Sequence, residues 1–336
     1  MTRISIFFRK PYDFHFSIEK LFRIMMPLLQ SEAEILEQIC PWPSRGLWPR
    51  IKALRWAAKC TSDVNHITGD VHYLALALPS RNTVLTIHDL GFTRHPNPVA
   101  RFILWLFWIY LPVHRVKAVT TISQASKNDI IRYAHCRPDK IRIIPNFVPP
   151  GLTYVPKSFQ EEMPVILQVG TKFNKNMERV IKALSGITCH FRIIGKLSAT
   201  QKQLMDTHGL DYSQDSGLSD KALVQEYLRC DMVTFCSTLE GFGMVILEAQ
   251  AIGRPVVTSN LSSMPEVAGE GACLVDPYDE KDIRRGILKV LNNHQYRQNL
   301  IQSGLANCKK YALDKVAAQY LQLYKEIAHP SGHSLR

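Results

Sequence analysis

The most informative stretch of the sequence is Glu240-Gly-Phe-Gly-Met-Val-Ile-Leu-Glu248, which is followed by Ala-Gln-Ala-Ile-Gly-Arg-Pro-Val-Val. Two carboxylates lie eight residues apart across a Gly-Phe-Gly turn, and the apolar residues after the turn predict a short helix. This helix should begin near Met244 and end at Gly253, because a glycine at that place followed by Pro255 is a common helix stop. The two glycines of the turn allow the backbone to approach a ligand closely.

The same segment carries chemistry that suits a sugar nucleotide. Glu240 precedes the expected helix, so a non-helical backbone can aim its carboxylate at a ligand. Glu248 falls inside the helix, shortly after its start. Free N–H groups and the dipole at a helix start favour a small anion. One segment therefore combines two hydroxyl-binding carboxylates with a helix end that accepts phosphate.

The length of the chain and the alternation of its elements predict two α/β domains. A chain of 336 residues is too long for one ordinary core. Apolar runs of strand length alternate with helical stretches, which is typical of parallel α/β layers. In the first half we expect strands at 3–8, 83–87, 118–122 and 141–144, and helices at 16–30, 46–59, 98–110 and 123–134. In the second half we expect strands at 165–170, 190–194, 232–235 and 255–258, and helices at 176–184, 219–229, 244–252 and 312–327.

A linker separates the two expected domains. Pro-Asn-Phe-Val-Pro-Pro-Gly (145–151) and the polar residues after it favour an irregular connection. The expected parts are a first domain over 1–147, a linker over 148–162, a second domain over 163–311, and a C-terminal helix and tail over 312–336 that packs back toward the first domain. Doubly wound sheets bind ligands at the carboxyl ends of their strands. The expected site is therefore a cleft between the two domains.

Charge and cysteine content limit the class of protein. The net charge is +12, and residues 1–150 hold 20 Lys and Arg against 10 Asp and Glu, whereas the rest of the chain holds 21 against 19. The first half therefore suits an anionic partner, or simply has a basic surface. The eight cysteines form no Cys-x-x-Cys pair, so reduced, buried thiols in a cytosolic protein are expected. The first residues contain no cleavage-site pattern, so no signal peptide is expected.

A series of motifs gives the chain a family resemblance. In the second half these are Val169-Gly-Thr-Lys-Phe-Asn-Lys-Asn176, Ile193-Ile-Gly195, Ser237-Thr-Leu-Glu-Gly-Phe-Gly-Met-Val-Ile-Leu-Glu-Ala249, Gly253-Arg-Pro-Val-Val257 and Met264-Pro-Glu-Val267. In the first half they are Thr86-Ile-His-Asp89, Thr121-Ile-Ser-Gln-Ala-Ser-Lys127 and Ile144-Pro-Asn146. In this order the motifs resemble the retaining glycosyltransferases of family 4, which have the GT-B fold. The resemblance implies two Rossmann-like, doubly wound domains that face a cleft, the first binding the acceptor and the second the nucleotide sugar.

The resemblance assigns donor-binding residues in the second half. It implies that Glu240 holds hydroxyls of the donor sugar, with help from the backbone of Phe242 and Gly243, and that Glu248 binds the ribose hydroxyls. A carboxylate that accepts from two neighbouring hydroxyls gives strong, directional recognition. The alternative is that Glu248 is an ordinary exposed helix residue and that the glycines merely form a turn.

A lysine between a strand and a helix is the candidate for the diphosphate. Lys175 can act there as a point charge, aided by the helix N-terminus. The family often has an arginine directly after Gly170, where this chain has Thr171, and the neighbouring Lys172 lacks the bidentate fork of an arginine. Thr171 is therefore the candidate at this position, and the sequence leaves open whether it makes the second phosphate contact. For both lysines a solvated loop position is the alternative.

Strand ends in the first half supply the acceptor-side candidates. His88 and Asp89 follow the strand expected at 83–87. The resemblance implies that His88 lies beside the reacting sugar and the acceptor, and that Asp89 orients the loop or the imidazole. A lone histidine is more often structural, and for His66 and His72 the structural interpretation is preferred.

Three basic residues complete the acceptor side. Ser123 is the expected N-cap of a helix, and Lys127 in its first turns either contacts an acceptor phosphate or is a surface lysine. The loop after the first strand usually carries paired glycines in the family, but the loop from Arg9 to Glu19 has none. Arg9 and Lys10 are therefore the candidates that replace backbone contacts by charge.

No metal and no redox cofactor are expected. The sequence has no Asp-x-Asp, no His/Cys cluster with ligand spacing and no G-x-G-x-x-G after a strand. The positive charge of Lys175 and helix dipoles would then stabilise the leaving diphosphate.

The first half contains an apolar run of twelve residues, Phe102–Val113, next to Arg101 and Arg115. The run is too short to span a bilayer. A helix that is apolar on every side is normally buried, which is the preferred interpretation. Trp105 and Trp108 beside cations also suit a membrane interface, so contact with an anionic membrane surface is the alternative.

These features together predict an enzyme. We expect a metal-independent, retaining glycosyltransferase that moves a hexose, mannose being one candidate, from a UDP- or GDP-linked sugar to a hydroxyl of a glycan or lipid-linked saccharide. The expected setting is surface polysaccharide or lipopolysaccharide biosynthesis, in the cytoplasm or peripherally on the cytoplasmic face of the membrane. The alternatives are a sugar-nucleotide epimerase-like GT-B enzyme and a catalytically inactive, membrane-associated assembly subunit. Nucleic-acid binding would explain the charge but no motif, so no nucleic-acid partner is expected.

Overall fold

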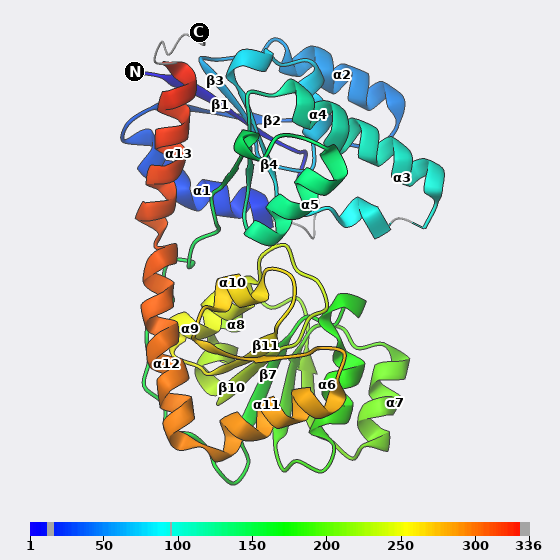
Figure 1. The fold of residues 1–336 in the computed structure, drawn as a ribbon, viewed down its shortest axis with the longest axis vertical. Coiled ribbons are helices and arrows are strands. Elements are labelled where there is room, and N and C mark those ends of the chain that lie inside the picture. The colour runs from blue at the N-terminus through cyan, green and yellow to red at the C-terminus, as the bar shows by residue number, and fades with distance from the viewer. Residues whose placement is uncertain (12–16, 95, 330–336) are drawn as a thin grey trace. The chain divides into compact units, whose positions relative to one another are not determined.

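The computed structural model describes residues 1–11, 17–94 and 96–329. The chain divides into two compact units, residues 1–146 with 313–336, and residues 147–312. Each unit is a parallel six-stranded sheet with helices packed against it (Figure 1). This confirms the predicted α/β class with two doubly wound sheets. The predicted cleft between the domains stays a prediction.

The sheet of the first unit has the order β2-β1-β3-β4-β5-β6. Its strands are β1 (Arg3–Phe8), β2 (Glu34–Ile39), β3 (Val64–Ile67), β4 (Thr83–Ile87), β5 (Ala118–Thr121) and β6 (Ile141–Ile143). Its α-helices are α1 (Ser17–Gln30), α2 (Leu47–Ala57), α3 (Pro98–Leu104), α4 (Leu111–Arg115), α5 (Gln124–Ala134) and α13 (Leu313–Ala328). The strand order changes direction between β1 and β3, which is where such sheets bind ligands.

The sheet of the second unit has the order β12-β11-β10-β7-β8-β9. Its strands are β7 (Val165–Val169), β8 (His190–Ile194), β9 (Asp211–Asp215), β10 (Met232–Phe235), β11 (Val256–Ser259) and β12 (Ala272–Val275). Its α-helices are α6 (Met177–Leu184), α7 (Ala199–Thr207), α8 (Asp220–Arg229), α9 (Met244–Ile252), α10 (Met264–Ala268), α11 (Glu280–Asn292) and α12 (His294–Cys308). Here the change of direction falls between β7 and β10.

Local signals place several helix ends where the sequence predicts them. The hydroxyl of Ser123 accepts a hydrogen bond from the backbone N–H of Ser126 at 3.1 Å, which confirms Ser123 as the N-cap of α5. Gly253 ends α9 with a φ of 83°, a left-handed conformation that favours glycine. Gly243 begins the same helix with a φ of 108°.

The last helix belongs to the first unit and is joined to its sheet through a buried histidine. α13 lies beside α1 (Figure 1). His66 of β3 has no exposed surface, and its Nδ1 and Nε2 lie 2.6 Å from the Tyr324 hydroxyl of α13 and 2.7 Å from the Thr86 hydroxyl of β4. Burial lowers the pKa of His66 to about 3, so the ring is neutral. The structural interpretation of His66 is confirmed.

Four strands lie outside the segments predicted from sequence, namely β2, β3, β9 and β12. β3 has a polar centre, Asn65-His66, whose side chains hydrogen-bond within the fold. β9 is a polar edge strand, Asp-Tyr-Ser-Gln-Asp, so neither shows an apolar run. Their partners in the sheet, rather than their own apolar content, make these residues strands.

The predicted helix over 98–110 is divided in the structure. α3 ends at Leu104, a π-helix follows at Trp105–Tyr110, and α4 begins at Leu111. Trp108 and Ile109 are buried, but the side of α3 that carries Val99, Phe102 and Ile103 is exposed, at 66%, 57% and 41%. The preferred interpretation, burial of the run 102–113, therefore holds for Trp108 and Ile109 and is wrong for Phe102 and Ile103. Among the described residues, no helix has both the length and the apolar content that a bilayer crossing requires.

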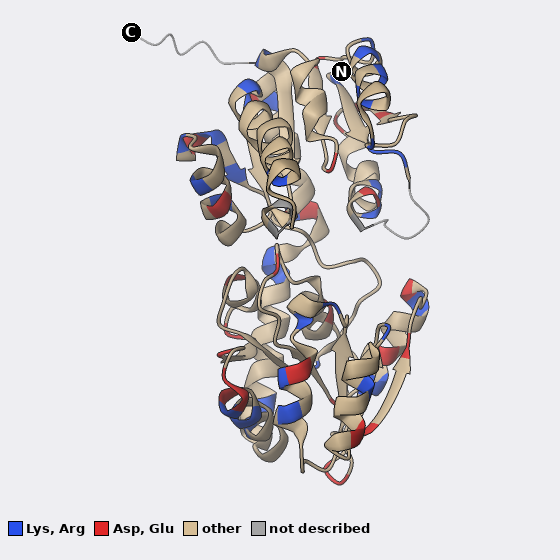
Figure 2. Cartoon of the chain, turned by 90° about the vertical axis from the view of Figure 1, so that its right-hand side faces the viewer, with Lys and Arg blue, Asp and Glu red and all other residues tan. Residues whose placement is uncertain are grey.

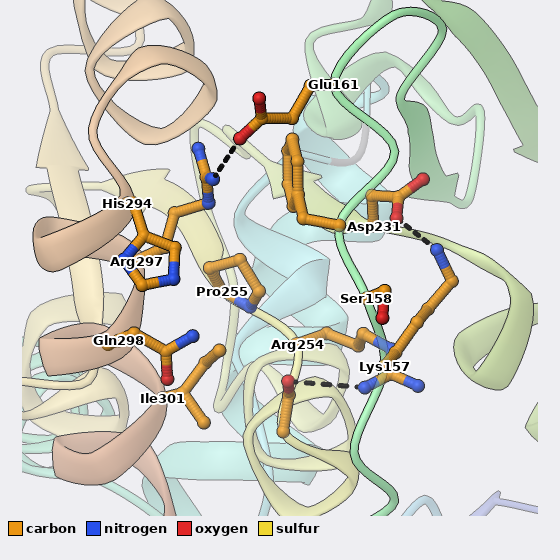
Figure 3. Close-up of a pocket in the computed structure, with 12 residues that line it drawn as sticks. Lys157, Ser158, Glu161, Asp231, Arg254, Pro255, His294, Arg297, Gln298 and Ile301 are labelled. Carbon is orange, nitrogen blue, oxygen red and sulfur yellow. Dashed lines mark hydrogen bonds and ion pairs between the residues drawn. The ribbon is translucent and has the colours of Figure 1, made fainter.

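A cavity of about 280 Å³ in the second unit is lined by charged side chains that pair within the protein. It lies near the amino ends of β10 and β11, and residues of the segment before β7 contribute to its lining. Figure 3 shows Lys157 pointing to Asp231 and Arg297 pointing to Glu161, and both pairs are ion pairs. Arg254 donates to the backbone carbonyls of residues 155, 227, 228, 252 and 253. These ion pairs and hydrogen bonds hold the segment before β7 and the ends of α8 and α9 in place.

Candidate active site

Two predicted residues meet at the switch point of the second sheet. Lys175 follows β7 and Glu240 follows β10, the two strands between which the order changes. The Lys175 ammonium donates to Glu240 Oε1 at 2.7 Å, and the Asn174 side-chain amide donates to the same oxygen at 3.1 Å. The two charged side chains are only 18% and 15% exposed. The structure therefore brings together the residues predicted for the diphosphate and for the sugar.

The turn that carries Glu240 is held by two serines that the sequence did not single out. Ser262 and Ser263 follow β11, and their hydroxyls donate to the backbone carbonyl of Glu240 at 2.7 and 3.0 Å. Ser263 Oγ also lies 2.8 Å from the carbonyl oxygen of Phe242. Ser262 has a φ of 57°, an uncommon conformation for a residue other than glycine. Residues that follow β7, β10 and β11 thus form one hydrogen-bonded cluster around Glu240.

A glycine makes room for the lysine. A Cβ atom on Gly170 would lie 2.9 Å from Cε of Lys175, and Gly170 has a φ of 91°. The Lys175 ammonium also lies 4.4 Å from the centre of the Phe235 ring, a cation–π contact. The position of Lys175 is therefore fixed by its packing as well as by Glu240.

Thr171 forms hydrogen bonds with two neighbouring loops of the second unit. Its hydroxyl donates to the backbone carbonyl of Lys196 at 2.8 Å, and its own carbonyl accepts from the Gln201 amide at 3.2 Å. A Cβ on Gly195 would lie 2.8 Å from Cγ2 of Thr171. The neighbouring Lys172 is exposed. Thr171 thus joins the loops after β7 and β8, and the second phosphate contact has no charged side chain at this position.

The other donor-side residues lie on or before α9. Phe242 is only 4% exposed, and its ring packs edge-on against Tyr311 with centroids 5.8 Å apart. Gly243 is the N-cap of α9, so the free N–H groups of that helix lie just after the turn. Glu248 is partly exposed, and its Oε2 accepts from the buried Tyr227 hydroxyl at 2.6 Å. Tyr227, from α8, is a residue that sequence reasoning missed.

Three of the predicted acceptor-side residues, Arg9, His88 and Asp89, gather at the switch point of the first sheet. A cavity of about 470 Å³ lies there, and it is lined by Arg9 after β1, His88 and Asp89 after β4, and the Gly69-Asp70 turn after β3, with His72 and Trp108 among its other lining residues. Gly69 has a φ of 149°, and a Cβ there would lie 3.3 Å from Cδ2 of His88. Glycine at position 69 therefore allows the backbone of this turn to lie close to the His88 imidazole in the cavity wall.

Arg9 lies at this cavity, whereas two other basic candidates do not. Its Nε donates to Glu19 at 2.7 Å and one terminal nitrogen donates to Asp70 at 2.6 Å. Lys10 is exposed and is not among the residues lining this cavity. The Lys127 ammonium donates to the backbone carbonyl of Ile141 at 2.9 Å, and Lys127 does not line the cavity either. The glycine-free loop that the sequence pointed to continues through 12–16, outside the described residues.

Two histidines of the cavity are neutral. Burial lowers the pKa of His88 to about 4, against smaller opposing effects of the Thr68 carbonyl and Asp89. Burial also lowers the pKa of His72, which is 6% exposed. The buried His72 ring is thus held within the fold, as its structural interpretation predicts, and it also lies among the residues that line the cavity. Within the described ranges, no group of three or more His, Cys, Asp or Glu side chains is arranged to hold a metal ion.

Comparison with known proteins agrees with both halves of the chain. Residues 155–306 match the family described as glycosyl transferases group 1, and residues 32–152 match glycosyltransferase family 4. The chain is 27% identical over 310 residues to O-antigen chain mannosyltransferase B of Escherichia coli, covering 84% of this chain and 78% of that protein. It is 26% identical over 226 residues to O-antigen chain mannosyltransferase RfbU of Salmonella typhimurium, covering 62% and 61%.

Solved structures show the same fold. A glycosyltransferase from Rickettsia africae superposes with a TM-score of 0.77 at 16% identity, covering 98% of this chain and 99% of that one. HepE of Anabaena, determined with UDP and glucose, gives 0.78 at 16% identity, covering 97% and 100%. With two family matches in the predicted order and two parallel sheets of the predicted type, the chain belongs to the glycosyltransferases of family 4 and has the GT-B fold.

Proposed function

We propose that this glycosyltransferase moves a hexose, mannose in the first instance, from a nucleotide-diphosphate sugar to a hydroxyl of a glycan or lipid-linked saccharide, with retention of configuration. The Lys175–Glu240 pair beside the start of α9 is the observation that carries the proposal. The O-antigen mannosyltransferases among the relatives support mannose as the sugar and surface polysaccharide as the product.

In this proposal each residue acts at a different part of the donor. Glu240 accepts hydrogen bonds from hydroxyls of the sugar, and Glu248 accepts them from the ribose. Lys175 shifts its ammonium toward the diphosphate when the donor enters, and the free N–H groups of α9 face the same anion. The leaving phosphate takes the acceptor proton, so no protein base is assigned. Lys175 and α9 supply positive charge without a metal ion.

A donor screen tests the donor half of the proposal. Thermal stabilisation by GDP-mannose, UDP-glucose and related sugar nucleotides is measured with EDTA present for wild type, Glu248→Ala and the control Glu280→Ala. Glu280 is also a helix glutamate of the second unit, 41% exposed and paired with Lys182. We expect one nucleotide to stabilise wild type and the control but not Glu248→Ala. Equal stabilisation of all three would contradict the assignment of Glu248.

Product analysis tests the reaction. With the selected donor and a mannose-terminated oligosaccharide, NMR of the product should show the anomeric configuration of the donor, and Glu240→Gln should remove most turnover. An inverted product would refute retention. Change of the donor sugar without any acceptor would favour the epimerase-like alternative, and donor binding without turnover would favour the inactive subunit.

A second part of the proposal concerns the membrane. The exposed face of α3 carries Val99, Phe102 and Ile103 beside Arg101, and Figure 2 shows Lys and Arg on several helices around the first sheet. Exposed apolar side chains beside cations suit the surface of an anionic bilayer. We therefore propose peripheral binding on the cytoplasmic face.

Vesicle binding tests the membrane proposal. Salt-sensitive sedimentation with phosphatidylglycerol vesicles should weaken in Phe102→Ser but not in the control Phe173→Ser, which alters a residue of the second unit that is 72% exposed. Absence of binding by wild type at low salt would contradict peripheral attachment.

A further inference from the structure

Two histidines line the cavity of the first unit, and each has one ring nitrogen that can only accept a hydrogen bond. His72 Nδ1 lies 2.7 Å from the backbone carbonyl oxygen of Trp108, and a carbonyl only accepts, so Nδ1 carries the proton. In the neutral ring, Nε2 then has a lone pair. His88 uses the other tautomer, because its Nε2 donates to the carbonyl of Thr68 at 2.9 Å. Its Nδ1 is therefore the acceptor.

Two carboxylates of the same wall also offer acceptor atoms. Asp70 binds Arg9 through Oδ2, and its side chain is 50% exposed. Asp89 accepts from the backbone N–H of Gly91 at 2.8 Å through Oδ1. The structure of the described residues shows no hydrogen bond to Oδ1 of Asp70 or to Oδ2 of Asp89. A ligand that supplies hydroxyl hydrogens can satisfy both oxygens.

Side-chain donors at the cavity are already engaged within the protein. Arg9 donates to Glu19 and to Asp70, and the Trp108 indole N–H donates to the backbone carbonyl of Asp70 at 2.9 Å. The charged side chains among the described lining residues are thus one guanidinium, that of Arg9, and two carboxylates, those of Asp70 and Asp89, beside two neutral imidazoles. Among the described lining residues, carboxylates therefore outnumber cations, although the first half of the chain is basic.

This polarity discriminates between classes of ligand. The oxygens of a phosphate are acceptors and carry negative charge, so a wall of acceptors and carboxylates repels it. A sugar ring instead has hydroxyls that donate, and it has a C–H face that can contact the apolar side of the cavity, formed by Leu104, Trp108 and Ile109.

We propose that this cavity binds a neutral sugar of the acceptor through its hydroxyls, that Asp70 is a residue that determines this specificity, and that a phosphate on the same sugar is excluded. The inference rests on the proposed function and narrows its acceptor. Arg9 acts as a positioning residue, since it holds the Asp70 carboxylate at the cavity.

Asp70→Asn is the variant best suited to the test. Asp70 has a φ of 53°, and asparagine tolerates this left-handed conformation well. The substitution removes the negative charge and replaces one acceptor oxygen by an amide donor. The matched control is Asp139→Asn, which alters an Asp in the same unit whose side chain is 65% exposed and which does not line the cavity.

The probes are methyl α-D-mannopyranoside and its 6-phosphate, and their binding to the full chain is measured by ligand-observed NMR. Wild type should bind the neutral glycoside at least about tenfold more tightly than the phosphate, since a hydrogen bond to a charged group is worth about 1.5–3 kcal/mol. Asp70→Asn should lose at least about tenfold in affinity for the neutral glycoside, while Asp139→Asn and Glu240→Gln keep it. If the glycoside bound in the second unit instead, Glu240→Gln would lose its affinity for the glycoside.

Three results would overturn the inference: tighter binding of the phosphate by wild type, unchanged binding in Asp70→Asn, or loss in Glu240→Gln alone. The wild-type comparison holds even if Asp70→Asn fails to fold. Failure of the proposed function is distinguishable, because it would show as no turnover of any donor while the neutral glycoside still binds through Asp70.

Discussion

Acidification should destabilise the first unit through His66, the histidine that joins α13 to the sheet. His66 bonds to Tyr324 and Thr86 as a neutral ring, and its pKa is lowered to about 3 by burial. In the unfolded chain an ordinary histidine has a pKa near 6.5. The unfolded state therefore binds more protons between the two values. The stabilising contribution is complete above about pH 6.5 and is lost as the pH falls toward 3.

The size of the effect follows from the two pKa values. Each unit of pKa difference corresponds to about 1.4 kcal/mol, so the whole difference amounts to about 5 kcal/mol. At pH 5 the unfolded histidine is almost fully protonated and the folded one hardly at all, so about 2 kcal/mol of the free energy of unfolding is lost relative to pH 7.5. His88 and His72, whose pKa values are also lowered, add to the slope of wild type in the same range.

Tryptophan fluorescence isolates the relevant unit. All five tryptophans, residues 42, 48, 56, 105 and 108, belong to the first unit. Urea unfolding at pH 7.5 and pH 5 is compared for wild type, His66→Gln and the exposed control His114→Gln. The difference in unfolding free energy between the two pH values should be about 2 kcal/mol smaller in His66→Gln than in the other two proteins. Equal differences in all three would show that His66 is not the buried neutral group described here.

Three further substitutions test the second unit. Tyr227→Phe removes the hydroxyl that donates to Glu248. The KM for the donor should therefore rise several-fold, with little change in kcat or melting temperature. A fall in kcat alone would refute a positioning role for Tyr227. Gly286→Ala places a Cβ against Cγ1 of Val275 in the core. We expect the free energy of unfolding, followed by thermal unfolding, to fall by about 1–3 kcal/mol. An unchanged melting temperature would contradict this packing. Lys175→Met should lower kcat about a hundredfold or more while the chain stays folded, and wild-type turnover would remove the lysine from the chemistry.

Much of the local structure around the predicted donor-binding residues could be predicted from the sequence. Glu240, the Gly243 turn and the helix that ends at Gly253 are close together in the chain, and glycine conformation and helix capping act over a few residues. The motif order also indicated the family, because many weak segments in one sequence order are specific together. The alternating apolar runs were sufficient for the α/β class.

Other features escaped prediction because they depend on residues distant in the chain. β3 is a strand because β1 and β4 flank it, although its centre is polar. Ser262 was missed because only the turn of the chain after β11 brings its hydroxyl to the carbonyl of Glu240. The hydrogen bond from the Lys127 ammonium to the carbonyl of Ile141 could not be predicted either, because α5 and β6 pack together only in the folded unit.

The sequence by itself therefore determined most of the elements, the family and the carboxylates that are predicted to bind the donor, since these depend on short-range pattern. Tertiary structure alone decided which side chains share a site. Lys175 and Glu240 are 65 residues apart, yet they meet because β7 and β10 are neighbours where the strand order changes. Arg9 and Asp70, 61 residues apart, meet for the same reason at the ends of β1 and β3. Parallel pairing sets the carboxyl ends of distant strands side by side, and no local pattern in the sequence encodes that pairing.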